Sequence, residues 1–375
     1  MRNGWVEATL RDALEPIANR PDGKDYPLVL SVTEKRGIIP QTEIFKHRIA
    51  TDDISKYKVL EPMDIAYNPY LLWCGAIGQW QGSEAGIVSP VYECYRVKSN
   101  CEPRYLGYIF ETGILTNYFD ALAIGSIVRR RRTIPSDFIA APILLPPLPE
   151  QKRIVDLISA VDTYIEALRQ QLESAKRSRN AVLHELLTVG GDDWVETTLD
   201  RVTECSWGNT ETTKSKYVES GFLAYSASGA DGFLDWFEHD RTAVVLSAIG
   251  AQCGKTWFAE GKWTSIKNTI WLKSDNSNLL DKYLYYLSNT DQFWQIRGQA
   301  QPFISLGDVK KTRVLLPPLR DQERIVEVIS EMDAFIESIQ RTSMEAKNLR
   351  SGLLSDLLSG SHEIPTAYDK VMGAA

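Results

Sequence analysis

Several short stretches hold residue types that could support catalysis, and the most suggestive is Ile249 to Thr256. Its sequence, Ile-Gly-Ala-Gln-Cys-Gly-Lys-Thr, approaches the pattern of a phosphate-binding loop. That loop needs four residues between its glycines, whereas three separate Gly250 from Gly254. It must also lead into a helix whose amides face the phosphate, but the residues from Trp257 onward continue like a strand. We predict a turn between strands that presents Lys255, and no nucleotide hydrolysis.

Other fragments with catalytic residue types are equally incomplete. Asn68-Pro-Tyr70 lacks the second proline of the Asn-Pro-Pro-Tyr loop of adenine methyltransferases, and no glycine turn for a methyl donor accompanies it. The tripeptides 22–24 and 260–262, Asp-Gly-Lys and Glu-Gly-Lys, are half of a nuclease carboxylate–lysine set and are common by chance. The five cysteines and four histidines have no metal-site spacing. The sequence predicts no catalysis, metal or cofactor in this chain.

Two polar stretches have residue types suited to nucleic acid. Four consecutive arginines, at 129–132, are either a solvated turn or a phosphate contact, because guanidinium groups bind phosphate in a bidentate manner. The stretch Arg297 to Ile304 takes the corresponding place in the second half of the chain. Its Gln299 and Gln301 could offer amides to adenine edges, or could simply cap a loop.

The elements that must position these residues include a long helix that occurs twice. Residues 144–188 and 315–359 are related by a constant offset of 171, which brings about 20 of 45 positions onto identical residues. Apolar residues recur at alternating spacings of three and four, the seam of a coiled coil. The seam residues are Ile154, Ile158, Val161, Ile165, Leu168 and Leu172 in the first copy, and Ile325, Ile329, Met332, Ile336 and Ile339 in the second. Arg179 and Arg350 each occupy one further seam position.

Each copy has the boundaries of a helix of about 40 residues, about 60 Å long. Leu-Pro-Pro-Leu forces an extended conformation before it, and glycines follow its last apolar positions. Two matched seams most simply bury against each other in an antiparallel pair. The alternative is that each helix packs separately on its own globular domain.

A second repeat completes the plan. The segment 5–10, Trp-Val-Glu-Ala-Thr-Leu, recurs at 194–199 just past the first helix. We predict an α+β protein with a pseudo-twofold internal repeat, in which two globular α/β heads are separated and joined by two long antiparallel coiled-coil helices. The predicted domains are head 1 (1–143), helix 1 (144–191), head 2 (192–314), helix 2 (315–360) and a disordered tail (361–375).

Within the heads, local composition predicts several elements. Strands are expected at 26–33, 64–67 and 87–97 in head 1, and at 243–247 and 268–272 in head 2. Helices are expected at 105–115 and 279–293. A hydrophobic content of 43% and a charged content of 24% are ordinary for globular proteins.

The net charge of −7 argues against an indiscriminate polyanion-binding surface. The second helix and its tail hold much of the excess of acidic residues, with 6 basic and 10 acidic side chains. The negative net charge therefore leaves room for a local basic face on the heads. No segment is long and apolar enough to cross a membrane, and the first residues lack a signal-peptide pattern. An odd number of cysteines without paired spacing is typical of reduced thiols, so we expect a cytoplasmic protein.

The order head, helix, head, helix, with Leu145-Pro-Pro-Leu-Pro-Glu-Gln151 and Leu316-Pro-Pro-Leu-Arg-Asp-Gln322, resembles the specificity subunits of type I restriction–modification systems. The resemblance covers almost the entire chain. The stretches 64–68, 75–78 and 86–90 are also similar to stretches common in the recognition domains of that family. The second helix motif departs only in having Arg-Asp where the first has Pro-Glu.

This resemblance implies a DNA-binding subunit without catalytic activity. Each head would be a target recognition domain that reads one half of a split, asymmetric site in double-stranded DNA. The helix pair would fix the spacing and dock two modification subunits, which would use S-adenosylmethionine to methylate adenine. Restriction subunits using ATP and magnesium would join them in a prokaryotic cytoplasm.

We expect the DNA contacts among basic and amide side chains of the two heads. The candidates are Lys46, Arg48, Tyr67, Asn68, Arg129, Arg130, Arg131 and Arg132 in head 1, and Lys214, Lys216, Lys255, Lys267, Asn268, Arg297, Gln299 and Gln301 in head 2. For any single lysine, a solvated surface charge is the simpler interpretation. The alternative for the whole chain is a coiled-coil adaptor whose heads bind proteins. A single-chain enzyme with fused cleavage is disfavoured because no length is left for a catalytic domain.

Overall fold

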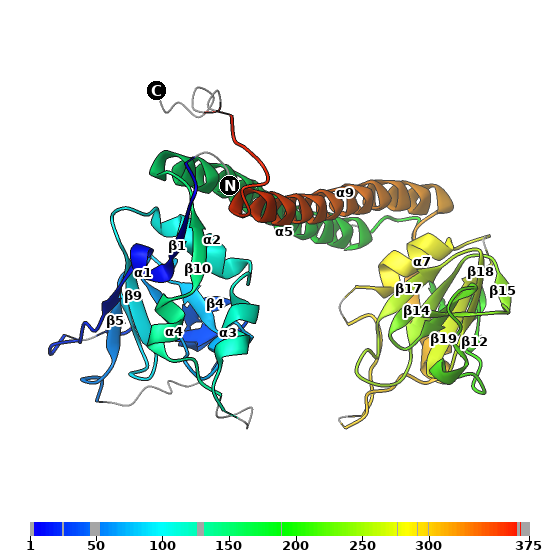
Figure 1. The fold of residues 1–375 in the computed structure, drawn as a ribbon. Coiled ribbons are helices and arrows are strands. Elements are labelled where there is room, and N and C mark those ends of the chain that lie inside the picture. The colour runs from blue at the N-terminus through cyan, green and yellow to red at the C-terminus, as the bar shows by residue number, and fades with distance from the viewer. Residues whose placement is uncertain are drawn as a thin grey trace. The chain divides into compact units, whose positions relative to one another are not determined.

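The chain forms two compact units. Unit 1 comprises residues 1–167 and 343–375, and unit 2 comprises residues 168–342. The computed structural model describes residues 4–24, 26–45, 53–125, 131–188, 190–275, 277–290, 292–298, 300–365 and 368. Each unit joins one head to segments of both long helices (Figure 1). Each unit therefore combines one predicted head with parts of both predicted helices, instead of coinciding with a single predicted domain.

The head of unit 1 is built on a four-stranded antiparallel sheet in the order β2-β9-β6-β7. Two further strand pairs, β3-β4 and β5-β8, and the short helices complete it. Its strands are β2 (Leu14–Ile17), β3 (Leu30–Thr33), β4 (Gly37–Pro40), β5 (Lys58–Leu60), β6 (Ile65–Tyr67), β7 (Ile77–Gln79), β8 (Gly86–Val88) and β9 (Glu93–Val97). Its helices are α1 (Leu10–Ala13), η1 (Gln41–Glu43), η2 (Leu72–Cys74), α2 (Pro103–Glu111), α3 (Thr116–Leu122) and α4 (Pro135–Ile139).

The head of unit 2 contains a sheet of the same design, in the order β12-β19-β16-β17, and a second four-stranded sheet in the order β14-β13-β18-β15. The strands are β12 (Thr203–Trp207), β13 (Phe222–Ser226), β14 (Gly229–Leu234), β15 (His239–Asp240), β16 (Ala243–Ser247), β17 (Thr256–Ala259), β18 (Lys262–Ser265) and β19 (Thr269–Ser274). The helices are α6 (Leu199–Val202), η4 (Lys214–Lys216), α7 (Asp281–Ser288) and α8 (Leu306–Lys311). The internal repeat therefore extends from the helices into the strand order of the heads.

The two repeated sequence motifs pair with each other. In unit 1, β1 (Val6–Thr9), from the Trp-Val-Glu motif, lies antiparallel to β10 (Pro142–Leu145), which leads into the Leu-Pro-Pro-Leu motif. In unit 2, β11 (Val195–Thr198) pairs with β20 (Arg313–Leu316) in the same way. Each ribbon thus joins the start of a head to the start of the long helix that follows it.

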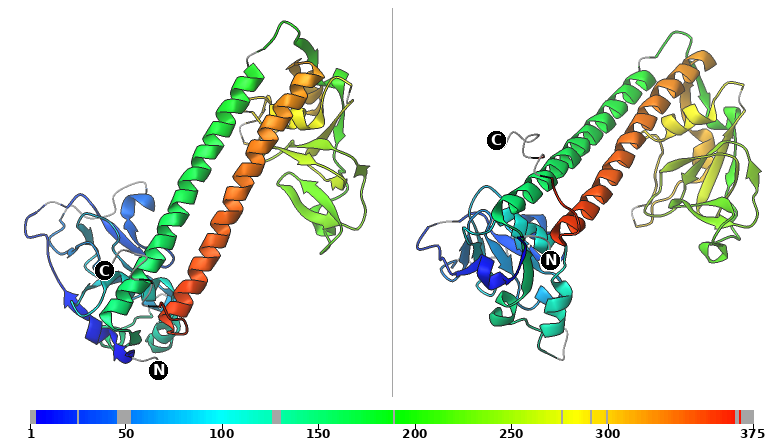
Figure 2. Two further views of the ribbon diagram at one scale, coloured as in Figure 1. Left: turned by 90° about the horizontal axis from the view of Figure 1, so that it is seen from above. Right: turned by 45° about the horizontal axis from the view of Figure 1, so that its top comes forward.

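The long helices are α5 (Leu148–Thr188) and α9 (Leu319–Leu358). In each unit their segments lie side by side and antiparallel, as both views of Figure 2 show. Every seam residue predicted from the sequence is buried or half-buried, whereas most positions between them are exposed. The alternative, in which each helix packs alone on its own domain, is wrong, because Ile158 of α5 and Leu354 of α9 share one core in unit 1.

Several local predictions need correction. The helix expected at 279–293 is shorter and spans Asp281–Ser288. The expected strand 87–97 is two strands, β8 and β9, because Pro90 between them lacks the amide that a ladder requires. The helix expected at 105–115 starts at Pro103 and ends at Glu111. The tail is not disordered over 361–365, since Ile364 is only 5% exposed and belongs to the core of unit 1.

Candidate functional site

Two loops of unit 1 lie together beyond the ends of β6 and β7. One spans residues 68–76, and the other comprises the described residues 123–125 and 131–134. The backbone amide of Thr133 donates to the carbonyl of Pro69 at 3.0 Å, which joins the two loops. The guanidinium of Arg131 lies 4.8 Å from the ring centre of Trp73, and that of Arg132 lies 5.6 Å from the ring centre of Tyr70. Aromatic side chains of one loop thus support cations of the other.

Unit 2 has an equivalent pair of loops beyond β16 and β17. One spans residues 248–255, and the other comprises the described residues 296–298 and 300–305. The amide of Ile304 donates to the carbonyl of Ala248 at 2.8 Å, and Arg297 and Phe303 exchange two backbone hydrogen bonds of 2.9 and 2.8 Å. We call these structures the paired loops of units 1 and 2. They occupy corresponding places in sheets of the same strand order, as the sequence predicted for the two polar stretches.

The incomplete phosphate-binding and methyltransferase motifs both fall on the first of these loops, 248–255 in unit 2 and 68–76 in unit 1. Gly250 and Gly254 have φ values of 106° and 94°, which only glycine adopts without strain. The chain continues from Lys255 into strand β17 rather than into a helix. The prediction of a turn between strands that presents Lys255 is therefore confirmed.

Some of the candidate cations are already paired with carboxylates of their own unit. Arg131 contacts Asp120 at 2.6 Å, and Lys214 contacts Asp231 at 2.5 Å. Arg297 pairs with Asp308. These partners fix the direction of each cation, and they also compensate part of its charge. Such side chains are better suited to holding the loops than to making the strongest new phosphate contact.

Other candidate cations have no ion pair with any residue that the structure describes. They are exposed, and they comprise Arg132 in unit 1 and Lys216, Lys255 and Lys267 in unit 2. Among the amides, Asn68 uses its side-chain oxygen to accept from the amide of Tyr70 at 3.1 Å. Asn268 is half-buried and Gln301 is exposed. Among the candidates that the structure describes, these cations and amides are the ones that remain available to a ligand.

One candidate is wrong. Tyr67 is 0% exposed, and its ring packs 4.3 Å from that of Phe138 in the core of unit 1. Burial raises the pKa of its hydroxyl above the ordinary tyrosine value. This side chain is a core residue and cannot reach DNA. Five further candidates lie outside the described residues: Lys46, Arg48, Arg129, Arg130 and Gln299.

The glutamine that ends each Leu-Pro-Pro-Leu-x-x-Gln motif has a role that sequence reasoning missed. Gln151 is 2% exposed; it accepts from the amide of Glu102 at 2.8 Å and donates to the carbonyl of Pro146 at 2.9 Å. Gln322 is 0% exposed and accepts from the amide of Leu280 at 3.0 Å. Each glutamine therefore ties the first turn of a long helix to its head. The repetition of a polar residue at the same place in both copies was the available signal.

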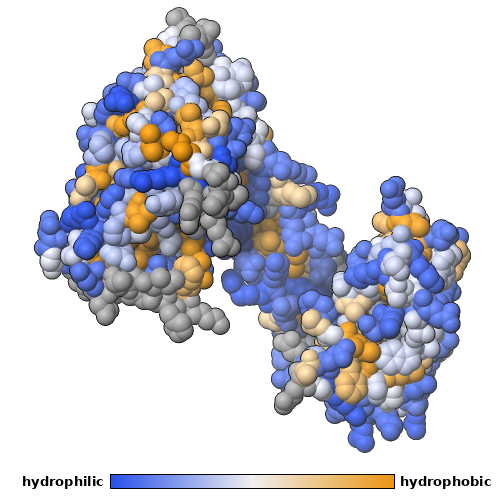
Figure 3. Space-filling model, turned by 60° about the horizontal axis from the view of Figure 1, so that its bottom comes forward, coloured by the Kyte–Doolittle hydropathy of each residue, from blue (hydrophilic) through white to orange (hydrophobic). Residues whose placement is uncertain are grey.

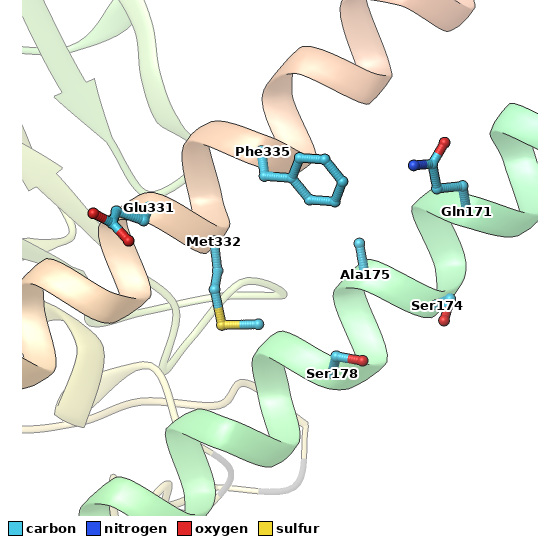
Figure 4. Close-up of a pocket in the computed structure, with 7 residues that line it drawn as sticks. All are labelled: Gln171, Ser174, Ala175, Ser178, Glu331, Met332 and Phe335. Atoms are coloured by element: carbon cyan, nitrogen blue, oxygen red, sulfur yellow. The ribbon is translucent and has the colours of Figure 1, made fainter.

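The helix segments of unit 2 also form a shallow groove of about 440 Å³. Met332 and Phe335 of α9 face Ala175 of α5 across it (Figure 4). Phe335 is 51% exposed, and so is Tyr164, which precedes it by 171 positions in the first helix. On the face in Figure 3, hydrophobic side chains stand in small groups among hydrophilic ones. Exposed aromatic residues repeated on a helix pair are typical of a protein-binding surface.

No cluster of histidine, cysteine and acidic side chains suited to a metal ion occurs among the described residues. None of the helices in the described part of the chain is long and apolar enough to span a membrane.

Each unit thus holds a mixed α/β head of one strand order, tied to segments of both long helices. Residues 191–348 match the family described as type I restriction modification DNA specificity domain. The chain is 22% identical over 405 aligned positions to a Methanocaldococcus jannaschii protein named as the type I restriction enzyme MjaX specificity subunit. That similarity covers 96% of this chain and 94% of the relative.

Solved structures agree. A crystal structure of the type I restriction–modification S subunit from M. genitalium matches with a TM-score of 0.58 and 14% identity, over 97% of this chain and 98% of that one. A chain from work on complex assembly and conformational transition of the type I R-M system matches with a TM-score of 0.60 and 18% identity, over 96% and 98%. At these identities the structural likeness establishes the fold.

The resemblance of the chain to type I specificity subunits is therefore confirmed, and residues 191–348 carry the match to the family model. DNA sequence recognition is the role of this family, and its members are non-catalytic. The predicted fold class, two mixed α/β heads with a long helix pair, is confirmed as well.

Proposed function

We propose that each head reads one half of a bipartite site in double-stranded DNA through its paired loops. The observation that carries this proposal is that both units place unlike polar side chains on equivalent loops of equivalent sheets. Cations without an ion pair, such as Lys255 and Arg132, would bind phosphates and fix the register of the head. The side-chain amide of Gln301 would face base edges, where an amide can pair with adenine. Asn268 lies outside the paired loops, but its backbone carbonyl accepts from the amide of Ala248 at 2.9 Å, so its side-chain amide could act beside them.

Replacement of one head should change one half of the recognised site. Methylome sequencing of cells that express this chain with its modification subunit should reveal adenine methylation at a bipartite sequence. When residues 192–314 are replaced by another recognition domain, we expect one half-site to change and the other half-site and the gap to remain. As a control, residues 192–314 are recoded with synonymous codons, so the protein is unchanged. The complex with this control chain should methylate the original site. Change in both halves, or in neither, would contradict a two-headed reader.

The exposed faces of the two long helices support a proposal about the partner subunits. We propose that two modification subunits dock on the exposed helix faces that carry Tyr164 and Phe335, because equivalent aromatic residues repeated in one chain suit two copies of one partner. This chain would bind no cofactor of its own. The modification subunits would use S-adenosylmethionine to methylate adenine, and restriction subunits using ATP and magnesium would add cleavage. The complex would act in the prokaryotic cytoplasm.

Substitution of the aromatic residues should remove the partners one at a time. We expect F335S to weaken the binding of one modification subunit by about 30-fold or more. Truncation of a central aromatic anchor typically costs at least about 2 kcal/mol of binding free energy. Native mass spectrometry should then show one bound copy instead of two, and Y164S combined with F335S should leave none. E337S changes an exposed residue of the same helix outside the groove and should keep both copies. Two bound copies in the double variant would refute this docking surface.

A further inference from the structure

One cluster of side chains occurs in both units and joins the head to both helices. In unit 1 it contains Tyr108 of α2, Ser159 and Asp162 of α5, and Arg350 of α9. In unit 2 it contains Tyr286 of α7, Ser330 and Asp333 of α9, and Arg179 of α5. The serine, aspartate and arginine of the two sets are related by the same offset of 171. We call each set a clasp.

In unit 1, the clasp is closed by hydrogen bonds and by an ion pair. The guanidinium of Arg350 donates to both carboxylate oxygens of Asp162, and the longer of these two hydrogen bonds measures 3.1 Å. It also donates to Glu111 at 3.0 Å. The hydroxyl of Tyr108 lies 3.2 Å from that of Ser159, and its ring centre lies 5.7 Å from the guanidinium. Although burial lowers the pKa of Arg350, the hydrogen bonds with Asp162 and Glu111 raise it above the ordinary value.

In unit 2, the same contacts recur with the roles of the helices exchanged. Arg179 donates to the two oxygens of Asp333 at 2.9 and 3.4 Å. The hydroxyl of Tyr286 lies 3.0 Å from that of Ser330, and its ring centre lies 5.4 Å from the guanidinium of Arg179. Asn289 stands where unit 1 has Glu111, at an offset of 178, so this clasp lacks the extra carboxylate.

Each clasp also fixes the register of the helices. Arg179 and Arg350 occupy seam positions, where a largely buried charge needs a partner. A slide of one heptad would place Val326 or Gln340 opposite Arg179 instead of Asp333. The same slide would place Val155 or Arg169 opposite Arg350. A polar seam residue that is satisfied in one register only is a known means of specifying that register.

From these contacts we infer that Arg179 and Arg350 are positioning residues for the spacing of the two half-sites. Each arginine binds the opposite helix and touches the tyrosine of a head, so the orientation of the head depends on the register of the helices. One base pair of DNA adds about 3.4 Å and about a tenth of a turn, so a head free to shift on its helices would accept a different gap. This inference rests on the proposed reading of a bipartite site.

The test measures gap selectivity with the purified complex of this chain and its modification subunits. Methylation rates are compared on duplexes that carry the native gap and on duplexes whose gap is one base pair shorter or longer. In R179M/R350M we expect the same half-sites and a ratio of native-gap to altered-gap rates that falls by about tenfold, within the usual range for coupled sites. R177M/R341M removes two exposed arginines of the same helices and should keep the wild-type ratio.

The charge swap R179D/D333R retains the ion pair and separates positioning from simple destabilisation. We expect it to recover most of the gap selectivity that R179M loses. An unchanged ratio in R179M/R350M would overturn the inference. If R179M/R350M does not fold, equal ratios in R179M and R179D/D333R would overturn it instead. A wild-type complex that methylates no bipartite site would instead refute the proposed function itself.

Discussion

Replacement of Gln322 by leucine should destabilise unit 2 by about 3–5 kcal/mol. The change removes the partner of three backbone groups, one in a buried and two in partly buried hydrogen bonds: the carbonyl of Pro317 at 2.9 Å, the amide of Leu280 at 3.0 Å and the carbonyl of Asn278 at 2.8 Å. Each unsatisfied buried group costs about 1–3 kcal/mol, and the leucine recovers part of this through apolar contact. Gln322 is fully buried, so water cannot take the place of its amide without a local opening.

Hydrogen exchange measured by mass spectrometry can locate this effect. In Q322L, exchange should rise by about two orders of magnitude or more in peptides from α7 and β19 of unit 2, whereas peptides from α2 of unit 1 should keep their protection. Q340L, at an exposed position of the same helix, should stay within about 0.5 kcal/mol of the wild type. Comparable exchange in Q322L and Q340L would show that the motif glutamine does not hold the head.

Removal of the cations without an ion pair should weaken DNA binding by about 100-fold at physiological salt and reduce its salt dependence. The variant replaces Arg132, Lys216, Lys255 and Lys267 by alanine. Each phosphate contact contributes about 0.9 to the slope of log K against log salt, so the magnitude of the slope should fall by about 3.6. Fluorescence anisotropy with a duplex that carries the methylated site, at several NaCl concentrations, measures both quantities.

The control replaces four exposed cations of the long helices, Arg177, Arg324, Arg341 and Lys347, by alanine. It removes the same charge from the chain, so a general electrostatic effect would lower the slope equally in both variants. A direct contact with DNA predicts a large change in the slope only in the variant that lacks Arg132, Lys216, Lys255 and Lys267. Variants of the paired cations, R297A and K214A, should lie between the two, because Asp308 and Asp231 already hold these side chains.

The long helices could be predicted because their signal is local and repeated. The spacing of apolar residues such as Ile158 and Ile329 predicts a heptad seam. The same spacing occurs in both copies of the helix, so each copy supports the prediction for the other. The position of the paired loops could be predicted as well, since the stretches around Arg132 and Arg297 take equivalent places in two copies of one plan. The turn that presents Lys255 followed from the strand-like residues on either side.

The remaining errors arise from long-range contacts. Tyr67 is polar enough to suit a DNA surface, and only the packing of Phe138 from a distant segment shows that it is buried. The pairing of Arg131 with Asp120 and of Arg297 with Asp308 likewise depends on how loops fold back. Ile364 stands alone in a segment without periodicity, so its place in a core could not be read from neighbouring residues.

The division of the chain into units has a consequence for synthesis on the ribosome. Unit 2 is a single continuous stretch, residues 168–342, and can fold as soon as it has emerged. Unit 1 needs residues 343–365 as well, because Leu354, Leu357 and Ile364 complete its core. The head translated first is therefore the one completed last, and its unfinished apolar surface stays exposed while the other unit is made. A nascent chain that has emerged from the ribosome only as far as residue 342 would therefore have a mature second head and an immature first one.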